Sequence, residues 1–242
     1  MAEMLINGVD IKTFNARLQT YSVGGTAVTN NTAAAESLVV LPALYYVNFG
    51  PRTLNITLTF FPRTAGSDSR NTSIPERLHR ATDNIIKFES LIVGKVVEIY
   101  LPDGYYYTAL VQTLPAPTFD ATGEHDVTYT FLAIRHLHEM SKTIAPNGKI
   151  TCLSNTDTKC IITASFSQAH ENVTLCDVII NDIAANDVVV IDSVNGLITN
   201  NGVNKFLDTE FYDFPLLSPG ENIISCTAND ASLQVTYTPV FA

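Results

Sequence analysis

The sequence contains no tryptophan, and charged side chains make up only 16% of its 242 residues. It also lacks a Gly-x-Ser-x-Gly elbow, a His-Glu-x-x-His motif, a phosphate-binding glycine loop and an EF-hand loop. These absences remove the common signatures of serine hydrolases, zinc proteases, nucleotide-dependent enzymes and calcium sensors. We therefore predict that the protein is not an enzyme, with no catalytic residues, no cofactor and no metal site.

A membrane-spanning sequence is missing as well. The apolar run from Leu38 to Phe49 is too short for the ~20 residues that a membrane helix needs, and it contains Pro42. The N-terminus, Met1-Ala2-Glu3, has neither the basic nor the apolar region of a signal peptide. We expect a soluble protein that is made in the cytoplasm.

Cysteine is scarce, and its spacing carries no metal or disulfide signature. The four cysteines are Cys152, Cys160, Cys176 and Cys226. Their spacings of 8, 16 and 50 residues match neither a Cys-x-x-Cys metal knuckle nor the dense disulfide framework of secreted proteins. We predict free thiols that act as small core residues, with Cys160 on the same inward face as Ile162, Ala164 and Phe166.

Length and charge predict two domains. A hydrophobic content of 46% is ample for a packed interior, and 242 residues are more than one core usually organises. Residues 1–145 hold 11 basic and 13 acidic side chains, whereas residues 146–242 hold 3 and 11. The boundary is expected near Ala145-Pro146-Asn147-Gly148, and the net charge of −8 beyond it (3 minus 11) disfavours nucleic-acid binding.

The first domain begins with turn and strand signals. Asn7-Gly8 predicts a hairpin within residues 4–18, and the strand-forming residues 54–61 predict a strand that ends at Pro62. Residues 21–35 are rich in Gly, Thr, Asn and Ala. They predict a long loop, and compact domains usually keep such loops for function or for contact with other chains.

One helix is predicted, followed by a hairpin and a strand. Ser73-Ile74-Pro75-Glu76 has the pattern of a capping box, and Gly94 is a stop signal. Between them, apolar residues recur at helical spacing: Leu78, Ala81, Ile85, Phe88 and Ile92. Pro102-Asp103-Gly104 then predicts a turn between strands at 95–101 and 105–112, and residues 126–134 alternate as a further strand.

The second domain alternates short strands with defined turns. Residues 188–193 predict a strand, and Asn195-Gly196 predicts a two-residue hairpin turn after it. Asn201-Gly202 repeats this turn, and Pro219-Gly220 precedes a strand expected at 222–226. Together with a last strand expected at 233–237, this pattern of short strands and turns predicts an antiparallel β-sandwich.

This second half resembles the C-terminal domain of the distal tail protein (Dit) family, a tail component of siphophages. The resemblance rests on a strand pair followed by a Phe-Pro-x-Leu-x-Pro-Gly-x-Asn turn, at Asp187, Val188, Val190, Asp192, Gly196, Leu197, Phe214, Pro215, Leu217, Pro219, Gly220 and Asn222. The element order of the first half resembles the N-terminal domain of the same family. The resemblance implies a mainly β protein: a split β-barrel with one α-helix that forms a ring (belt) over residues 1–145, and a galectin-like β-sandwich over residues 146–242.

The resemblance also implies a structural hub in the virion, at the distal end of the phage tail. Such a hub is a hexameric ring that joins the tail tube protein to a tail-tip or tail-associated lysozyme protein and to a receptor-binding protein. DNA passes through it without specific recognition, no membrane is involved, and assembly takes place in the bacterial host cytoplasm. Residues 21–35 and Tyr105-Tyr106-Tyr107 are candidate subunit contacts, because tyrosine is enriched in interfaces. The alternative for the triplet is one core tyrosine and two on a solvated sheet face.

The alternative function is a lectin-like, carbohydrate-binding module of a phage tail. Galectins hold sugars with a His-x-Asn-x-Arg strand and a tryptophan platform. Here His170-Glu171-Asn172 is followed by Thr174, and no arginine occurs after Arg135. Tyr212 or Phe211 could stack on a sugar, although packing in the core or a loop is the more ordinary role. We therefore favour the hub.

The histidines offer one weak metal pattern. His136 and His138 would share a strand face beside Glu139, but no third ligand is evident, and a solvated linker is the alternative. His79 is expected on the exposed face of the helix, and His125 in a turn before a strand.

Overall fold

The computed structural model describes residues 4–33, 43–62, 73–116, 118–119 and 123–241. Contacts between Cα atoms divide the chain into two units, residues 1–136 and 137–241. The expected boundary lies nine residues further along the chain, between 145 and 146. The difference arises because the strand at Met140–Ile144 pairs within the second unit.

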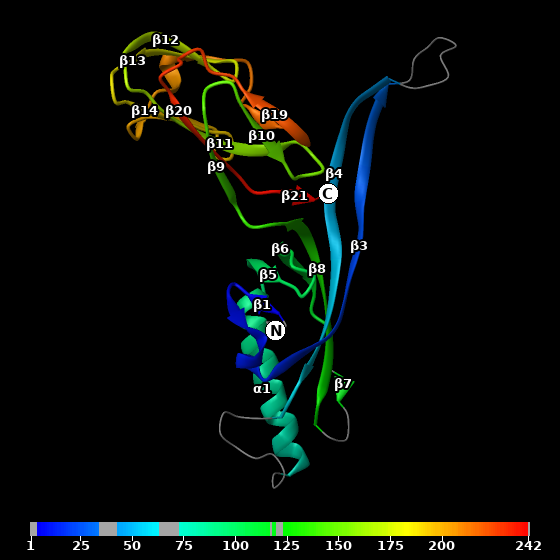
Figure 1. Ribbon diagram of the computed structural model, residues 1–242. Helices are drawn as coiled ribbons and strands as arrows, with labels where there is room; N and C mark the ends of the chain where they lie inside the picture. Colours follow the sequence, from blue (N-terminus) through cyan, green and yellow to red (C-terminus); the bar gives the residue numbers. More distant parts are fainter. Residues whose placement is uncertain (1–3, 34–42, 63–72, 117, 120–122, 242) are drawn as a thin grey trace, which may run out of the picture. The chain divides into compact units, whose positions relative to one another are not determined.

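The first unit is one antiparallel sheet with a single long helix (Figure 1). The strand order is β2-β1-β5-β6-β8-β4-β3, and β7 pairs with β8. The elements are β1 (Leu5–Ile6), β2 (Val9–Asp10), the 3-10 helix η1 (Ile11–Phe14), β3 (Ala16–Ala33), β4 (Ala43–Phe60), α1 (Ile74–Ile92), β5 (Val96–Tyr100), β6 (Tyr106–Thr113), β7 (Thr118–Phe119) and β8 (His125–His136).

The predicted turns of this unit are confirmed. Asn7 and Gly8 both have positive φ, 48° and 76°, and they join β1 to β2 as a two-residue hairpin. Gly104, with φ of 84°, lies in the turn between β5 and β6. Asparagine and glycine tolerate this left-handed conformation better than other residues, which makes such turns readable from sequence.

The predicted long loop at residues 21–35 is wrong for residues 21–33, the part that the structure describes. Residues 21–33 belong to β3, which pairs with β4 along nearly its whole length, from Ala16↔Phe60 to Ala33↔Ala43. The predicted strand at 54–61 is the end of β4. Residues 34 and 35 lie outside the described part of the chain.

Helix α1 covers one face of the sheet. Ser73 is its N-cap with extended backbone, as the sequence predicts, but the Ser73 side chain makes no capping hydrogen bond of the kind that a capping box requires. The apolar stripe lies inward as predicted, with Phe88 and Ile92 fully buried. The Phe88 ring contacts three others, with centroids 5.8 Å from Phe14, 5.5 Å from Phe60 and 5.2 Å from Tyr129.

The second unit is an antiparallel sandwich (Figure 1). One layer has the order β16-β15-β14-β11-β20-β9, with β18 beside β11. The other contains β10-β19 and β12-β13-β17, linked by a bridge between Leu175 and Cys226. The elements are β9 (Met140–Ile144), β10 (Gly148–Cys152), β11 (Thr158–Ser165), β12 (His170–Leu175), β13 (Val178–Ile183), β14 (Val188–Asp192), β15 (Leu197–Asn200), β16 (Val203–Asn204), the 3-10 helix η3 (Phe206–Asp208), β17 (Thr209–Glu210), β18 (Leu216–Leu217), β19 (Gly220–Ile224), β20 (Ser232–Tyr237) and β21 (Val240–Phe241).

One of the three turn predictions in this unit holds in detail, and a second holds with a strand that begins earlier than expected. Asn201 and Gly202 form the predicted two-residue turn, because Asn200 pairs with Val203. Gly220 has φ of 90° and begins β19, two residues before the expected strand start. The loop before β15 is longer than predicted, because Asp192 pairs with Leu197 and leaves residues 193–196 between them. Asp192 holds this loop by accepting hydrogen bonds from the backbone N–H groups of Val194 and Asn195.

The two layers of the sandwich enclose one apolar core, and the predicted inward face of β11 is confirmed. Cys160, Ile162 and Ala164 are fully buried, and Phe166 follows them inward. All four thiols are free, and Cys176 alone is partly exposed. The fold class is therefore confirmed: a mainly β protein, with one α-helix in its first part and an antiparallel sandwich in its second.

Candidate interaction surfaces

The sheet of the first unit has an outer face, opposite to the face that α1 covers, on which exposed apolar side chains lie beside the polar Glu98 and Thr108. Side chains alternate across a strand, so the neighbours of the buried Val97 and Ala109 point outward. Val96 pairs with Leu110, which pairs with Leu132 on β8. Val96 is 67% exposed, and Leu110 is also exposed. This rung of apolar residues lies across three strands without a covering layer among the described residues of the unit.

An aromatic rung lies at the other end of the same face. Tyr100 pairs with Tyr106, which pairs with His136. The ring centroids are 5.0 Å apart for the two tyrosines and 5.9 Å apart for Tyr106 and His136, which are stacked. Between the two rungs, Ile134 is 48% exposed. We call Val96, Leu110, Ile134, Tyr100 and Tyr106 the outer sheet face.

The three consecutive tyrosines have different environments. Tyr107 is fully buried and donates a 2.6 Å hydrogen bond to Asp103. Burial raises the pKa of the Tyr107 phenol, and the bond to Asp103 raises it further. Tyr105 packs against the core, with the Arg135 guanidinium 4.6 Å from its ring centroid. Tyr106 alone belongs to the outer sheet face.

The hairpin of β3 and β4 extends beyond the rest of the sheet. Strand β4 pairs with β8 only from Arg52 to Phe60, and residues 43–51 of β4 have backbone partners only on β3 among the described residues. An isolated two-stranded hairpin is marginally stable in water. This part of the hairpin would therefore gain stability from a further packing partner.

The histidines occupy different environments in the described part of the chain. His136 ends β8 and His138 lies beyond the strand, so the predicted shared strand face is wrong. His125 is fully buried on β8, where a turn was predicted. His79 is exposed on α1, as predicted, 3.7 Å from Asp83. Across the described ranges, no three His, Cys, Asp or Glu side chains are grouped to hold a metal ion.

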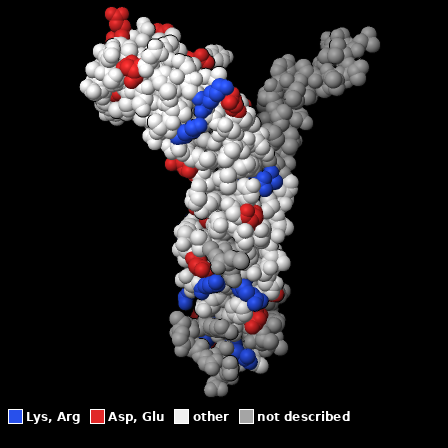
Figure 2. All heavy atoms as spheres, viewed as in Figure 1, with Lys and Arg blue, Asp and Glu red and all other residues white. Residues whose placement is uncertain are grey.

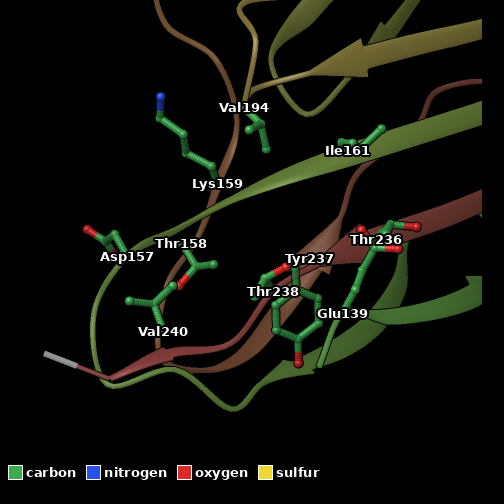
Figure 3. A pocket seen from close by; sticks show the side chains of 10 residues that line it. All are labelled: Glu139, Asp157, Thr158, Lys159, Ile161, Val194, Thr236, Tyr237, Thr238 and Val240. Carbon is green, nitrogen blue, oxygen red and sulfur yellow. The ribbon is translucent and has the colours of Figure 1, made fainter. Parts of the chain in front are cut away.

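The second unit has a pocket of about 340 Å³ at the end of β11 and β20 (Figure 3). The lining residues are Glu139, Asp157, Thr158, Lys159, Ile161, Val194, Thr236, Tyr237, Thr238 and Val240. Tyr237 supplies no stacking platform, because it is buried and its hydroxyl donates to the Thr151 carbonyl at 2.9 Å. The pocket can accept an apolar group but lacks the exposed aromatic ring typical of sugar sites.

The galectin-like residues on β12 serve the fold. His170 Nε2 lies 2.8 Å from Asp230 Oδ1, and Asp230 also accepts hydrogen bonds from the backbone N–H groups of Ser167 and Gln168. The backbone N–H of Thr174, the residue in place of the galectin arginine, donates to Thr227 at 3.0 Å. The two aromatic candidates differ, because Phe211 packs against the core whereas Tyr212 is fully exposed.

In the part of the chain that the structure describes, helices long and apolar enough to cross a membrane are absent. Sequence reasoning did not identify the exposed Val96, Leu110 and Ile134 as a surface. The signal that could have found them is the alternation within the predicted strands, combined with the single helix that can cover only one face.

Comparison with known proteins identifies the second unit by sequence. Residues 153–241 match the family model described as siphovirus-type tail component, C-terminal domain. A search of curated proteins gives no match.

Comparison with solved structures extends to the whole chain. The SPP1 Dit (gp 19.1) protein, described as a paradigm of hub adsorption apparatus in phages that infect Gram-positive bacteria, has a TM-score of 0.73 at 13% identity, covering 99% of each chain. Two phage p2 baseplate structures in activated conformations, with Sr and with Ca, have TM-scores of 0.39 and 0.40 at 13% identity, covering 94% of this chain and 92% of theirs.

The similarity to SPP1 Dit shows that the chain has this fold, and the family match gives its sequence relationship. Both agree with the resemblance found in the sequence. Residues 153–241 are thus similar in sequence to the C-terminal domain of siphovirus-type tail components, and the whole chain shares the fold of SPP1 Dit.

Proposed function

We propose that the protein is a structural, non-enzymatic hub of a phage tail tip or baseplate. The first unit associates with copies of itself into a hexameric ring, and the second unit provides docking sites for other tail proteins. The observation that carries the proposal is the outer sheet face, where Val96, Leu110 and Ile134 are exposed on one side of a sheet. Full burial of such a side chain contributes about 1.5–3 kcal/mol, and these partly exposed ones contribute a fraction of that when a neighbour covers them.

The hairpin of β3 and β4 supports the same proposal. Its outer part, residues 26–33 and 43–51, has no third strand among the described residues. Packing against an adjacent copy would give this hairpin the support that two strands lack. A closed ring supplies each copy with such a neighbour on both sides.

The family match and the hub described for SPP1 Dit support the proposal that the protein has partners within the tail. The ring joins the tail tube protein to a tail-tip or tail-associated lysozyme protein, and a receptor-binding protein docks on its periphery. DNA passes through the ring without specific recognition, and no membrane contact is involved. The protein is assembled in the bacterial host cytoplasm and lies at the distal end of the virion tail.

A double variant of the outer sheet face tests this function. Val96→Lys with Ile134→Lys adds charge at exposed positions, so the fold is preserved while self-association is lost. Mass photometry of the native chain, with the tail tube protein added, is expected to give particles that contain six copies of the chain. The double variant should remain monomeric, and the control Ile223→Lys, an exposed apolar position of the second unit, should form the same particles as the native chain.

The alternative of a lectin-like module has less support. The His170 side chain, which a galectin-type site would use for sugar, is bound to Asp230. A glycan array with the full-length chain separates the two functions: the hub proposal expects no bound glycan, and a specific glycan lost in Tyr212→Ala would favour the lectin.

A further inference from the structure

The second unit has an exposed apolar patch on the segment that connects its two layers. We define the η3 patch as Val203, Phe206, Leu207 and Tyr212. Tyr212 is fully exposed, Leu207 is 97% exposed and Val203 is 70% exposed. Single exposed apolar residues are ordinary, whereas several large ones on one short segment favour an interaction site.

The patch is continuous with the core of the sandwich. The Phe206 ring centroid lies 5.3 Å from that of Phe211 and 6.4 Å from that of Phe214. Phe211 and Phe214 pack in turn against the buried cluster between the layers. The exposed residues are thus supported from below by an aromatic layer, and a partner would extend this layer outward.

Hydrogen bonds hold the segment in one conformation. The backbone N–H of Lys205 donates to the Ile198 carbonyl at 2.9 Å, which ties the segment to β15. The backbone N–H of Phe206 donates to Asn204 Oδ1 at 2.9 Å, and Thr209 Oγ1 donates to the Phe206 carbonyl at 2.8 Å. Strand β17 then pairs with β13. An ordered segment loses less entropy on binding than a flexible loop does.

The border of the patch is acidic. Asp208, Glu210 and Asp213 are exposed beside the apolar residues. The one basic residue of the segment, Lys205, lies 3.1 Å from Asp208, and its side chain is only 16% exposed. Figure 2 shows acidic side chains spread over the visible face of the second unit, with basic ones gathered in one area.

We propose that the η3 patch docks another protein of the same tail, through an apolar pocket bordered by Lys or Arg. This inference rests on the proposed hub function and names the chemistry of one docking site. The acidic border repels a second copy of the patch, nucleic-acid phosphates and anionic lipid headgroups. A basic protein surface is instead electrostatically complementary to this border. Tyrosines that become buried on binding commonly anchor protein interfaces.

Biolayer interferometry with the full-length chain tests the proposal. The probes are the other purified tail proteins of the same particle, each measured at low and high salt. We expect one of them to bind the native chain, and Leu207→Ser with Tyr212→Ser to weaken that binding at least tenfold. Glu210→Lys should weaken it and reduce its salt dependence, because a favourable charge pair is lost. Ile223→Ser, an exposed apolar position outside the patch, is the matched control and should bind as the native chain does.

The outcomes separate this inference from the hub function. A tail protein that binds the native chain and the double variant equally well contradicts the η3 patch alone. If no tail protein binds the native chain, the hub function fails and the patch proposal fails with it. Binding by the patch only to saccharides, to anionic vesicles or to a second copy also overturns the proposal. Each variant should unfold at the same temperature as the native chain, which confirms that its fold is intact.

Discussion

His170 Nε2 lies 2.8 Å from Asp230 Oδ1, so the histidine in the galectin-like position is bound to a carboxylate that also holds the loop before it. The same carboxylate accepts hydrogen bonds from Ser167 and Gln168, at 3.0 Å and 2.9 Å from their backbone nitrogens. One side chain therefore fixes the connection between the two layers of the sandwich.

Replacement of Asp230 should destabilise the second unit. Asp230→Ala leaves the donors of Ser167, Gln168 and His170 without their acceptor, and the melting temperature is expected to fall by a few degrees. Calorimetry measures this change. Asp230→Asn keeps an acceptor and should lose less, and equal melting temperatures for all three proteins would contradict the assigned role.

The same residue predicts a pH dependence. Burial raises the pKa of Asp230, but hydrogen bonds from Gln168, His170 and Ser167 outweigh this effect and lower it overall. A lowered folded-state pKa gives stability that is present above the unfolded value of about 4 and is lost as pH falls through the folded value. Urea unfolding at pH 7 and at pH 3 should show the difference between native and Asp230→Asn shrinking at the lower pH.

Two buried tyrosines should resist ionisation. Burial raises the pKa of Tyr107 and of Tyr129, and carboxylates that accept their hydrogen bonds, Asp103 and Glu89, raise both values further. Raised folded-state values mean that this stability is present below the unfolded value of about 10 and is lost as pH rises through the folded value. Ultraviolet titration should show a class of phenols that ionises only on unfolding. Tyr107→Phe and Tyr129→Phe should each remove one member of this class, whereas Tyr212→Phe should not.

The core of the first unit depends on Phe88. Phe88→Ala removes three ring contacts and leaves a cavity, so the free energy of unfolding should fall by about 3–5 kcal/mol. Urea unfolding measures the change. Ile86→Ala on the exposed side of the same helix is the control and should change stability by no more than about 0.5 kcal/mol. A similar small effect at both positions would argue against the packing described for α1.

The cysteines should react slowly while the chain is folded. Burial raises the pKa of Cys160 to about 12 and that of Cys176 to about 11, so neither thiol is ionised near neutral pH. Alkylation at pH 8 followed by mass spectrometry should label both residues only after denaturant is added. A disulfide in the non-reduced protein would contradict the prediction of free thiols.

The elements that the sequence predicts correctly are those whose signal lies within one short segment of the chain. The turns at Asn7-Gly8 and Asn201-Gly202 need left-handed backbone, and few residue types accept it, so the sequence signal is specific. The stripe of α1 is equally local, because the helical period repeats within one segment. The loop before β15 was predicted too short, because the hydrogen bonds from its backbone to Asp192 outweigh the Asn-Gly signal.

Pairing between distant segments explains what the sequence did not predict. Residues such as Gly24 and Gly25 favour loops by composition, yet β3 is a strand because β4 pairs with it. The outer sheet face has the same origin. Alternation separates Val96 from Val97, but only the packing of α1 determines which of them is buried. The η3 patch could not be predicted, because Phe211 and Tyr212 are adjacent aromatic residues with opposite exposure.

The most direct test of the hub is an image of the assembled protein. Negative-stain electron microscopy of the native chain, mixed with the tail tube protein of its own particle, should show closed rings of six subunits. The same preparation with Val96→Lys and Ile134→Lys should show none. If the native sample contains only monomers, at concentrations where the tail tube protein itself assembles, the account is contradicted.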